Sequence, residues 1–210
     1  MELFIKYWYL VLAIIVSLIL TVFVISKAAK SVALSKIEKE KLIKKLDHEK
    51  DLRQSFKVLT NECFGITDKY RLLEGIGMNV QIRVEDKQDM AAAFLALPVQ
   101  MRYIYALSIL FEDCREKPLS FFFKANGIPL TPTALEAVEK IIGGRFFELF
   151  SFEYSAFDEE NADVSVIKED IDKADSEFTA LLERDRENLL SLIAAYINEN
   201  KAIFINYSEG

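Results

Sequence analysis

The sequence predicts a mainly α-helical protein with an N-terminal transmembrane helix, a basic helical stalk and an all-α globular domain. Three observations carry this prediction. Residues 7–26 are uncharged and mostly apolar, residues 27–60 contain neither Pro nor Gly, and the remaining residues repeat apolar side chains at helical spacing. A short alternating stretch at 80–84 leaves room for one β segment. We therefore divide the 210 residues into an anchor at 1–26, a stalk at 27–60 and a domain at 61–210.

The apolar run YWYLVLAIIVSLILTVFVIS has the length of one membrane crossing. About 20 helical residues with a rise of about 1.5 Å span a hydrocarbon core of about 30 Å. Seven lysines follow the run between residues 27 and 45, whereas Lys6 alone precedes it. The positive-inside rule then predicts a single-pass protein of the inner (cytoplasmic) membrane, with the N-terminus outside and the domain in the cytoplasm. The alternative is a cleaved signal peptide followed by export, which the small residues Ser26, Ala28 and Ala29 leave open.

The stalk is predicted as one helix whose first half is solvated and whose second half packs on the domain. Lys and Glu interleave with loosely spaced apolar residues, namely Leu34, Ile37, Leu42, Leu46, Leu52, Phe56 and Leu59. A coiled coil is not expected, because Lys41, Glu49 and Arg53 interrupt every heptad register. The lysines either bind anionic lipid headgroups or only set topology and solubility.

Charge is distributed unequally along the chain. Residues 1–46 contain eight Lys and three acidic residues, a net +5, and residues 47–210 contain 18 basic and 30 acidic residues, a net −12. An acidic domain repels phosphate, so direct nucleic-acid binding is not expected. A basic protein surface would be attracted.

The domain begins with two helical patterns and an ambiguous glycine segment. Gly75-Ile76-Gly77 is predicted as a turn before a strand or extended linker at Val80–Val84, because a dinucleotide-binding loop would need a third glycine, a preceding strand and a following helix. Asp89 is expected to cap a helix that Pro98 ends. The next helix runs to about Glu116.

The helix between Pro98 and about Glu116 has a clear core face and two tyrosines beside it. The apolar positions recur at helical spacing and are Met101, Ile104, Leu107, Leu110, Phe111 and Cys114. Tyr103 and Tyr105 lie off this face and are predicted to mark a contact surface.

The second half of the domain is predicted to hold three further helical parts. Residues 118–127 form a short aromatic helix that ends with Gly127 in the left-handed conformation. Thr131 or Thr133 caps the next helix, with Glu136 completing a capping box, and Gly143-Gly144 ends it. A polar loop follows the aromatic run at 146–150, and a pair of helices, around 167–182 and 189–197, closes the domain.

Catalytic and metal-binding signatures are absent from the sequence, so the protein is predicted not to be an enzyme and to need no cofactor or metal. His48 is the only histidine, which excludes Ser-His-Asp and Cys-His systems and histidine-ligated zinc. Cys63 and Cys114 are expected to be reduced and half-buried. The acidic runs after residue 157 lack the glycine of a calcium loop. Glu112 and Glu116 share a helix face, and they keep a carboxylate-dependent hydrolase at the membrane as an alternative.

The second half of the chain has an FFF segment, an Asn-Gly turn, a Thr-Pro helix, an acidic loop and paired helices ending in Tyr196-Ile197, in that order. With this order, about residues 95–205 resemble the helical domain of bacterial DNA-mimic proteins and their uncharacterised relatives. The chain departs from that family where Lys117-Pro118-Leu119 replaces its Gly-Gly-Phe stretch and Asn126 abuts Gly127. The resemblance implies carboxylates spaced as in duplex DNA that occupy the DNA-binding face of a repressor. From Glu148 to Glu187 the chain has 14 acidic and four basic residues.

The leading hypothesis is a membrane-anchored, non-enzymatic interaction module that presents its acidic domain to a basic protein in the cytoplasm. A DNA mimic that sequesters a DNA-binding protein is the first alternative, and an acidic run that is only a solvated face is the plainest explanation. The predicted partner-binding residues lie on the aromatic turn and in the acidic segment: Phe121, Phe122, Phe123, Asn126, Asp158, Glu159, Glu160, Asp163, Glu169, Asp170 and Asp172.

Overall fold

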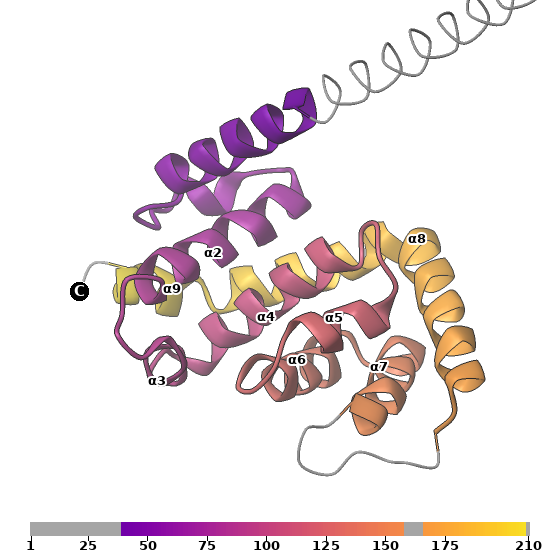
Figure 1. Ribbon diagram of the computed structural model, residues 1–210. Helices are drawn as coiled ribbons and strands as arrows, with labels where there is room; N and C mark the ends of the chain where they lie inside the picture. Colours follow the sequence, from indigo (N-terminus) through magenta and orange to yellow (C-terminus); the bar gives the residue numbers. More distant parts are fainter. Residues whose placement is uncertain (1–38, 158–165, 209–210) are drawn as a thin grey trace, which may run out of the picture. The chain divides into compact units, whose positions relative to one another are not determined.

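The structure is a computed structural model that describes residues 39–157 and 166–208, which form parts of two units. The first unit comprises Met1–Lys50 and the second Asp51–Gly210. Figure 1 shows the described helices of the second unit in sequence colours. Within the described residues, no helix is long and apolar enough to cross a bilayer, and the predicted anchor at 7–26 lies outside them.

Residues 39–55 are helical, so the stalk helix ends about five residues before the predicted position. In the first unit, Leu42 and Leu46 expose more than half of their surface. In the second unit, Leu52, Phe56 and Leu59 are buried. The compact unit therefore starts at Asp51 and includes the last ten residues assigned to the stalk by sequence.

The described part of the second unit is helical throughout and contains no strand, which confirms the prediction of a mainly α fold. The elements that follow the stalk helix are η1 (Cys63–Gly65), α2 (Lys69–Val84), α3 (Met90–Leu95), α4 (Val99–Asp113), α5 (Leu119–Ala125), α6 (Leu130–Ala137), the π-helical turn η2 (Val138–Ile142), α7 (Gly144–Phe157), α8 (Lys168–Glu199) and α9 (Lys201–Ser208).

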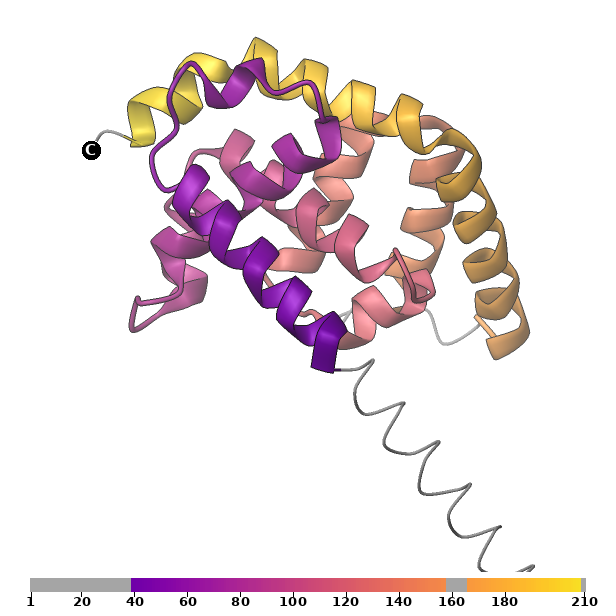
Figure 2. The same cartoon turned by 90° about the horizontal axis from the view of Figure 1, so that it is seen from above.

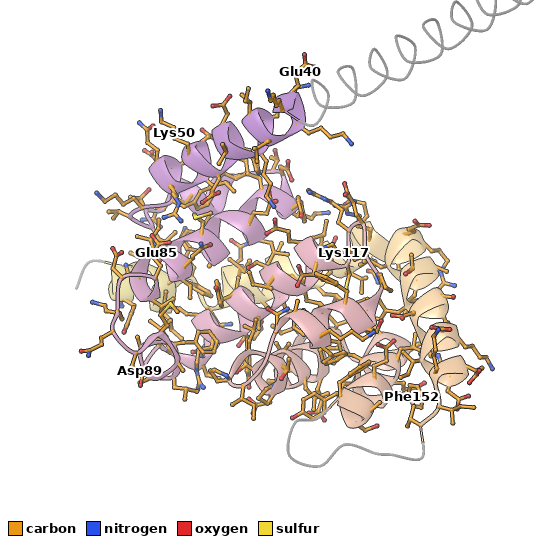
Figure 3. The ribbon with its side chains drawn as sticks, in the orientation of Figure 1. Glu40, Lys50, Glu85, Asp89, Lys117 and Phe152 are labelled. Carbon is orange, nitrogen blue, oxygen red and sulfur yellow. The ribbon has the colours of Figure 1, made fainter. Side chains whose placement is uncertain are left out.

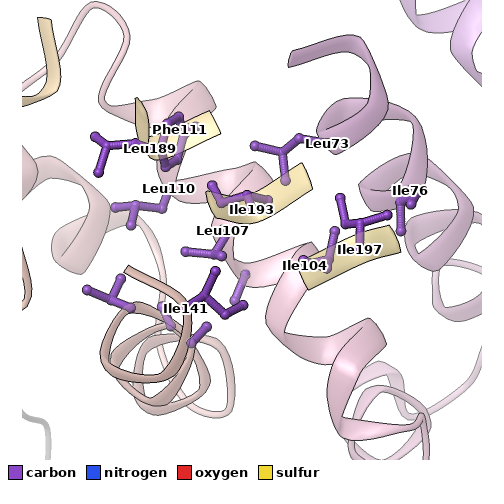
Figure 4. Packing of buried hydrophobic residues seen from close by; sticks show 14 of the residues in the cluster. Leu73, Ile76, Ile104, Leu107, Leu110, Phe111, Ile141, Leu189, Ile193 and Ile197 are labelled. Carbon is purple, nitrogen blue, oxygen red and sulfur yellow. The ribbon is translucent and has the colours of Figure 1, made fainter. Parts of the chain in front are cut away.

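The centre of the core lies where α2, α4 and α8 meet (Figure 4). The predicted core face of α4 is confirmed, since Met101, Ile104 and Leu107 are fully buried. Leu73 and Ile76 of α2 approach this face, and Ile193 of α8 packs against the same cluster. Removing such side chains from water at about 25 cal/mol per Å² is the main stabilising contribution to the fold.

Gly75 and Gly77 lie inside α2, so the predicted turn and the strand at Val80–Val84 are both wrong. A Cβ built on Gly75 would overlap the ring of Phe56, and one on Gly77 would overlap the side chain of Ser108. Both glycines therefore allow neighbouring segments to approach the helix backbone closely. Packing favours glycine here despite its low helix propensity.

Replacing Gly75 by Ala is expected to destabilise the protein by about 1–3 kcal/mol, because the methyl group must displace the fully buried ring of Phe56. The gain in helix propensity, about 1 kcal/mol, offsets only part of that cost. Chemical denaturation of the full chain measures the effect. Gly65→Ala is the matched control, since no atom lies within 4 Å of its added Cβ. A Gly75→Ala variant as stable as wild type would contradict the close packing.

The residues around α3 and α4 confirm one prediction and correct another. Asp89 caps α3 by accepting a hydrogen bond from the backbone N–H of Ala92 at 2.9 Å. Tyr103 and Tyr105 do not form an open contact surface, because both are half-buried against the core. The Tyr103 hydroxyl donates to Glu136 at 3.0 Å, and the Tyr105 ring lies 5.6 Å from that of Phe94.

The ends of α5 and α6 differ from the predicted caps. The left-handed glycines of the described residues are Gly143 and Gly144, as expected at the end of η2, but Gly127 is not one of them. Helix α6 begins at Leu130, so neither Thr131 nor Thr133 caps it and no capping box forms. Thr133 instead donates its hydroxyl to the carbonyl of Pro129 at 2.8 Å.

Helix α8 is one helix of 32 residues, and the predicted helix pair is therefore wrong. Leu182 and Leu189 are seven residues apart, which keeps both apolar patterns on one stripe. The charged residues between them include neither Gly nor Pro, so nothing interrupts the helix. In Figure 2 the helix curves along one side of the unit, as long helices do when they wrap around a core.

Candidate functional site

A groove of about 440 Å³ lies between α7 and the first turns of α8. Its lining from α7 is Arg145, Glu148, Leu149 and Phe152, and its lining from α8 is Asp170, Lys173, Ala174 and Glu177. Leu149 and Ala174 are buried, whereas Phe152, which is labelled in Figure 3, is 36% exposed. The groove thus has an apolar floor between charged sides.

An arginine joins the two walls of the groove. The Arg145 Nε and Nη2 atoms donate to the two carboxylate oxygens of Glu177, each at 2.8 Å, and Nη1 donates to Glu148 at 2.8 Å. Hydrogen bonds from this guanidinium hold the pKa of Glu177 below its usual value. We call the three side chains the Arg145 clasp.

One of the predicted acidic residues on α8 lines the groove. This residue is Asp170, whereas Glu169 and Asp172 are exposed on the same first turns of the helix and are not part of the lining. The other four predicted carboxylates, Asp158, Glu159, Glu160 and Asp163, lie outside the described residues. The described part therefore places one of the seven predicted carboxylates in the groove.

The predicted aromatic docking residues are mainly core residues. Phe122 and Phe123 are buried and pack on the ring of Phe150, at 5.9 and 4.9 Å between ring centroids, which corrects their assignment to a docking surface. Phe121 is half-buried, with the ammonium of Lys117 3.5 Å from its ring centre. The Asn126 side chain is used internally, because it donates to the Asp113 carboxylate and to the Phe122 carbonyl.

Two acidic side chains are buried where α5, α7 and α8 meet. Asp175 of α8 accepts hydrogen bonds from the Ser120 backbone N–H at 2.8 Å and from the Ser120 hydroxyl at 2.7 Å. It thereby caps α5 from another helix, since the residue before that helix, Pro118, offers no side-chain cap. Glu153 of α7 is fully buried, and neither of its carboxylate oxygens has a hydrogen-bond partner among the described residues.

Burial is the main reason that the pKa of Glu153 rises to about 9, and the nearby charge of Asp175 adds to the effect. The side chain is therefore protonated and neutral at pH 7. This position could have been noticed in the sequence, because Glu153 follows Phe146, Leu149 and Phe150 at helical spacing and so falls on a buried face. The effect of Asp175 on this pKa could not be predicted, because Asp175 lies on another helix, 22 residues further along the chain.

The alternative carboxylates and the cysteines show no enclosed site in the described residues. Glu112 and Glu116 are both exposed, and Glu116 lines an open hollow of about 430 Å³ beside Cys114. Both cysteines are free and buried, and burial raises the pKa of the Cys114 thiol far above its usual value, which keeps it unreactive. No group of three or more His, Cys, Asp and Glu side chains in this part is placed to hold a metal ion.

Comparison with protein-family models, with curated proteins and with solved structures gives no match to this chain.

Proposed function

We propose that this protein is a non-enzymatic interaction module, anchored in the inner membrane by residues 7–26, that docks a basic amphipathic segment of a protein partner in the α7–α8 groove on the cytoplasmic side. The observation that carries the proposal is one groove in which the partly exposed Phe152 lies near three carboxylates, Glu148, Asp170 and Glu177, which outnumber the two basic side chains of the same lining. A short segment with apolar residues on one side and Lys or Arg beside them has the complementary pattern.

The apolar residues of the groove could anchor a docked segment. Phe152 is an aromatic ring held on a helix, partly exposed, and set beside the buried Leu149 and Ala174. Aromatic side chains in such surroundings carry a large share of the binding energy in many interfaces. A partner's apolar side chain placed against this ring would remove both from water.

The exposed carboxylates of α8 favour a partner of positive charge. Asp170 lines the groove, and the carboxylates of Glu169 and Asp172 are exposed on the same turns of α8. They belong to a segment whose net charge is −12 from residue 47 onward. Such a field attracts a basic partner, speeds its association and repels nucleic acid.

Phe152→Ala is expected to weaken binding of a basic amphipathic peptide about tenfold, because the aromatic anchor is lost. The probe is a Leu/Lys peptide of about 15 residues with a single Arg, long enough to form a helix on binding. Titration of the full chain in lipid nanodiscs measures the dissociation constant. Leu192→Ala is the matched control, because Leu192 is 39% exposed and lies on the far part of α8.

A specific groove and a nonspecific attraction give different results in this experiment. Equal binding by wild type, Phe152→Ala and Leu192→Ala would show that the peptide responds only to overall negative charge, and the docking proposal would then be abandoned. The same applies if wild type does not bind the peptide at physiological ionic strength. A loss confined to Phe152→Ala supports the groove.

A further inference from the structure

We infer that Glu148 and Glu177 form a guanidinium-binding subsite in the α7–α8 groove, which Arg145 fills in the free protein and an arginine of the partner takes over on docking. The inference rests on the proposed docking function and adds the chemistry of one contact to it. Arg145 would then act as an internal competitor that sets the affinity for the partner.

The geometry of the clasp is that of arginine recognition. Two parallel hydrogen bonds join the guanidinium to Glu177, and a third joins it to Glu148, all at 2.8 Å. The planar guanidinium matches a carboxylate at both oxygens, whereas a lysine ammonium acts as a point charge. The subsite therefore favours arginine over lysine, and the neighbouring Lys173 of the same groove acts on Glu177 only through its charge.

The Arg145 clasp is exposed to solvent, so a partner's arginine can replace Arg145 in it. The side chains of Arg145, Glu148 and Glu177 are 53%, 62% and 43% exposed. Ion pairs in such surroundings contribute little to stability, because water competes for both charges. One guanidinium leaves as another enters, so the charge of the subsite stays constant and Arg145 becomes solvated.

A partner's arginine also has an advantage that Arg145 lacks. Arg145 reaches the subsite from α7 itself, next to the apolar floor but without covering Phe152, which stays partly exposed. A docked segment would fill the subsite and cover Phe152 at the same time. The second contact favours the exchange.

Arg145→Gln is expected to tighten binding of the single-Arg peptide about threefold, since the internal competitor is removed. Arg184→Gln is the matched control: it changes net charge equally and breaks another exposed ion pair, which Arg184 forms with Asp185 on α8. It should change affinity less than Arg145→Gln does. Glu177→Gln should abolish the gain when combined with Arg145→Gln, because the subsite is then lost.

A second peptide, with neutral citrulline in place of its arginine, separates the subsite from the groove. Arg145→Gln should leave the affinity for this peptide nearly unchanged. If both peptides gain equally, or if Arg184→Gln has the same effect as Arg145→Gln, the guanidinium subsite is overturned while a Phe152-dependent groove stands. Failure of both peptides to bind wild type overturns the docking proposal itself.

Discussion

Replacing Glu153 by Gln is expected to stabilise the protein by about 3 kcal/mol at pH 7. The folded state holds Glu153 protonated with a pKa of about 9, whereas the unfolded chain ionises it at its ordinary pKa of 4.5. At pH 7 the folded protein must therefore keep a proton that the unfolded chain releases, and each pH unit above 4.5 costs about 1.4 kcal/mol. Gln has nearly the same shape and no charge to desolvate.

The pH dependence gives the sharper measurement. Because the folded-state pKa is raised, the contribution of Glu153 to stability is fully present below about pH 4.5 and is lost progressively as pH rises towards 9. The difference in unfolding free energy between Glu153→Gln and wild type should thus grow from near zero at pH 4.5 to about 3 kcal/mol at pH 7. Glu139→Gln, at an exposed glutamate, controls for the change in net charge. A difference that stays flat with pH would mean that Glu153 ionises normally in the fold.

Removing the Asp175 carboxylate is expected to have the opposite effect. Asp175→Ala leaves the buried N–H and hydroxyl of Ser120 without their acceptors and takes the cap from α5. Hydrogen bonds to a charged group contribute about 1.5–3 kcal/mol each. Glu153 is neutral at pH 7, so the substitution relieves no charge repulsion there, and loss of the two hydrogen bonds should cost about 3 kcal/mol or more.

Denaturant unfolding at pH 7 measures this loss, with two variants to locate its origin. Asp172→Ala removes an exposed carboxylate three residues earlier on α8 and should have little effect. Asp175→Asn retains an acceptor for Ser120 and should recover part of the stability. If Asp175→Ala and Asp172→Ala were equally stable, the cap on α5 would not contribute.

Sequence periodicity was sufficient where a helix buries one continuous face. The face of α4 and the cap at Asp89 depend on residues within a few positions of each other, and both could be predicted. The helix at α2 could not be predicted, because Gly75 and Gly77 are typical turn residues. Their place in a helix is explained only by the close packing of Phe56 and Ser108 against them. Local propensity was overridden there by packing between distant segments.

The groove shows the same limit for function. Of the acidic residues on α8 that the sequence predicts as binding residues, Asp170 alone lines the groove. Arg145 and Phe152 were missed, because only the packing of α7 on α8 brings them together with Asp170 and Glu177. The FFF segment is wrongly predicted as a docking surface, because its apolar character indicates burial as readily as binding.

Asp175 and Glu177 lie two residues apart on α8 and face different surroundings: the first caps α5 inside the core, and the second joins Arg145 at the surface. The backbone turn that holds one carboxylate in place therefore also fixes the other. Loss of the internal cap on α5 would therefore also weaken the support that holds Glu177 beside Arg145.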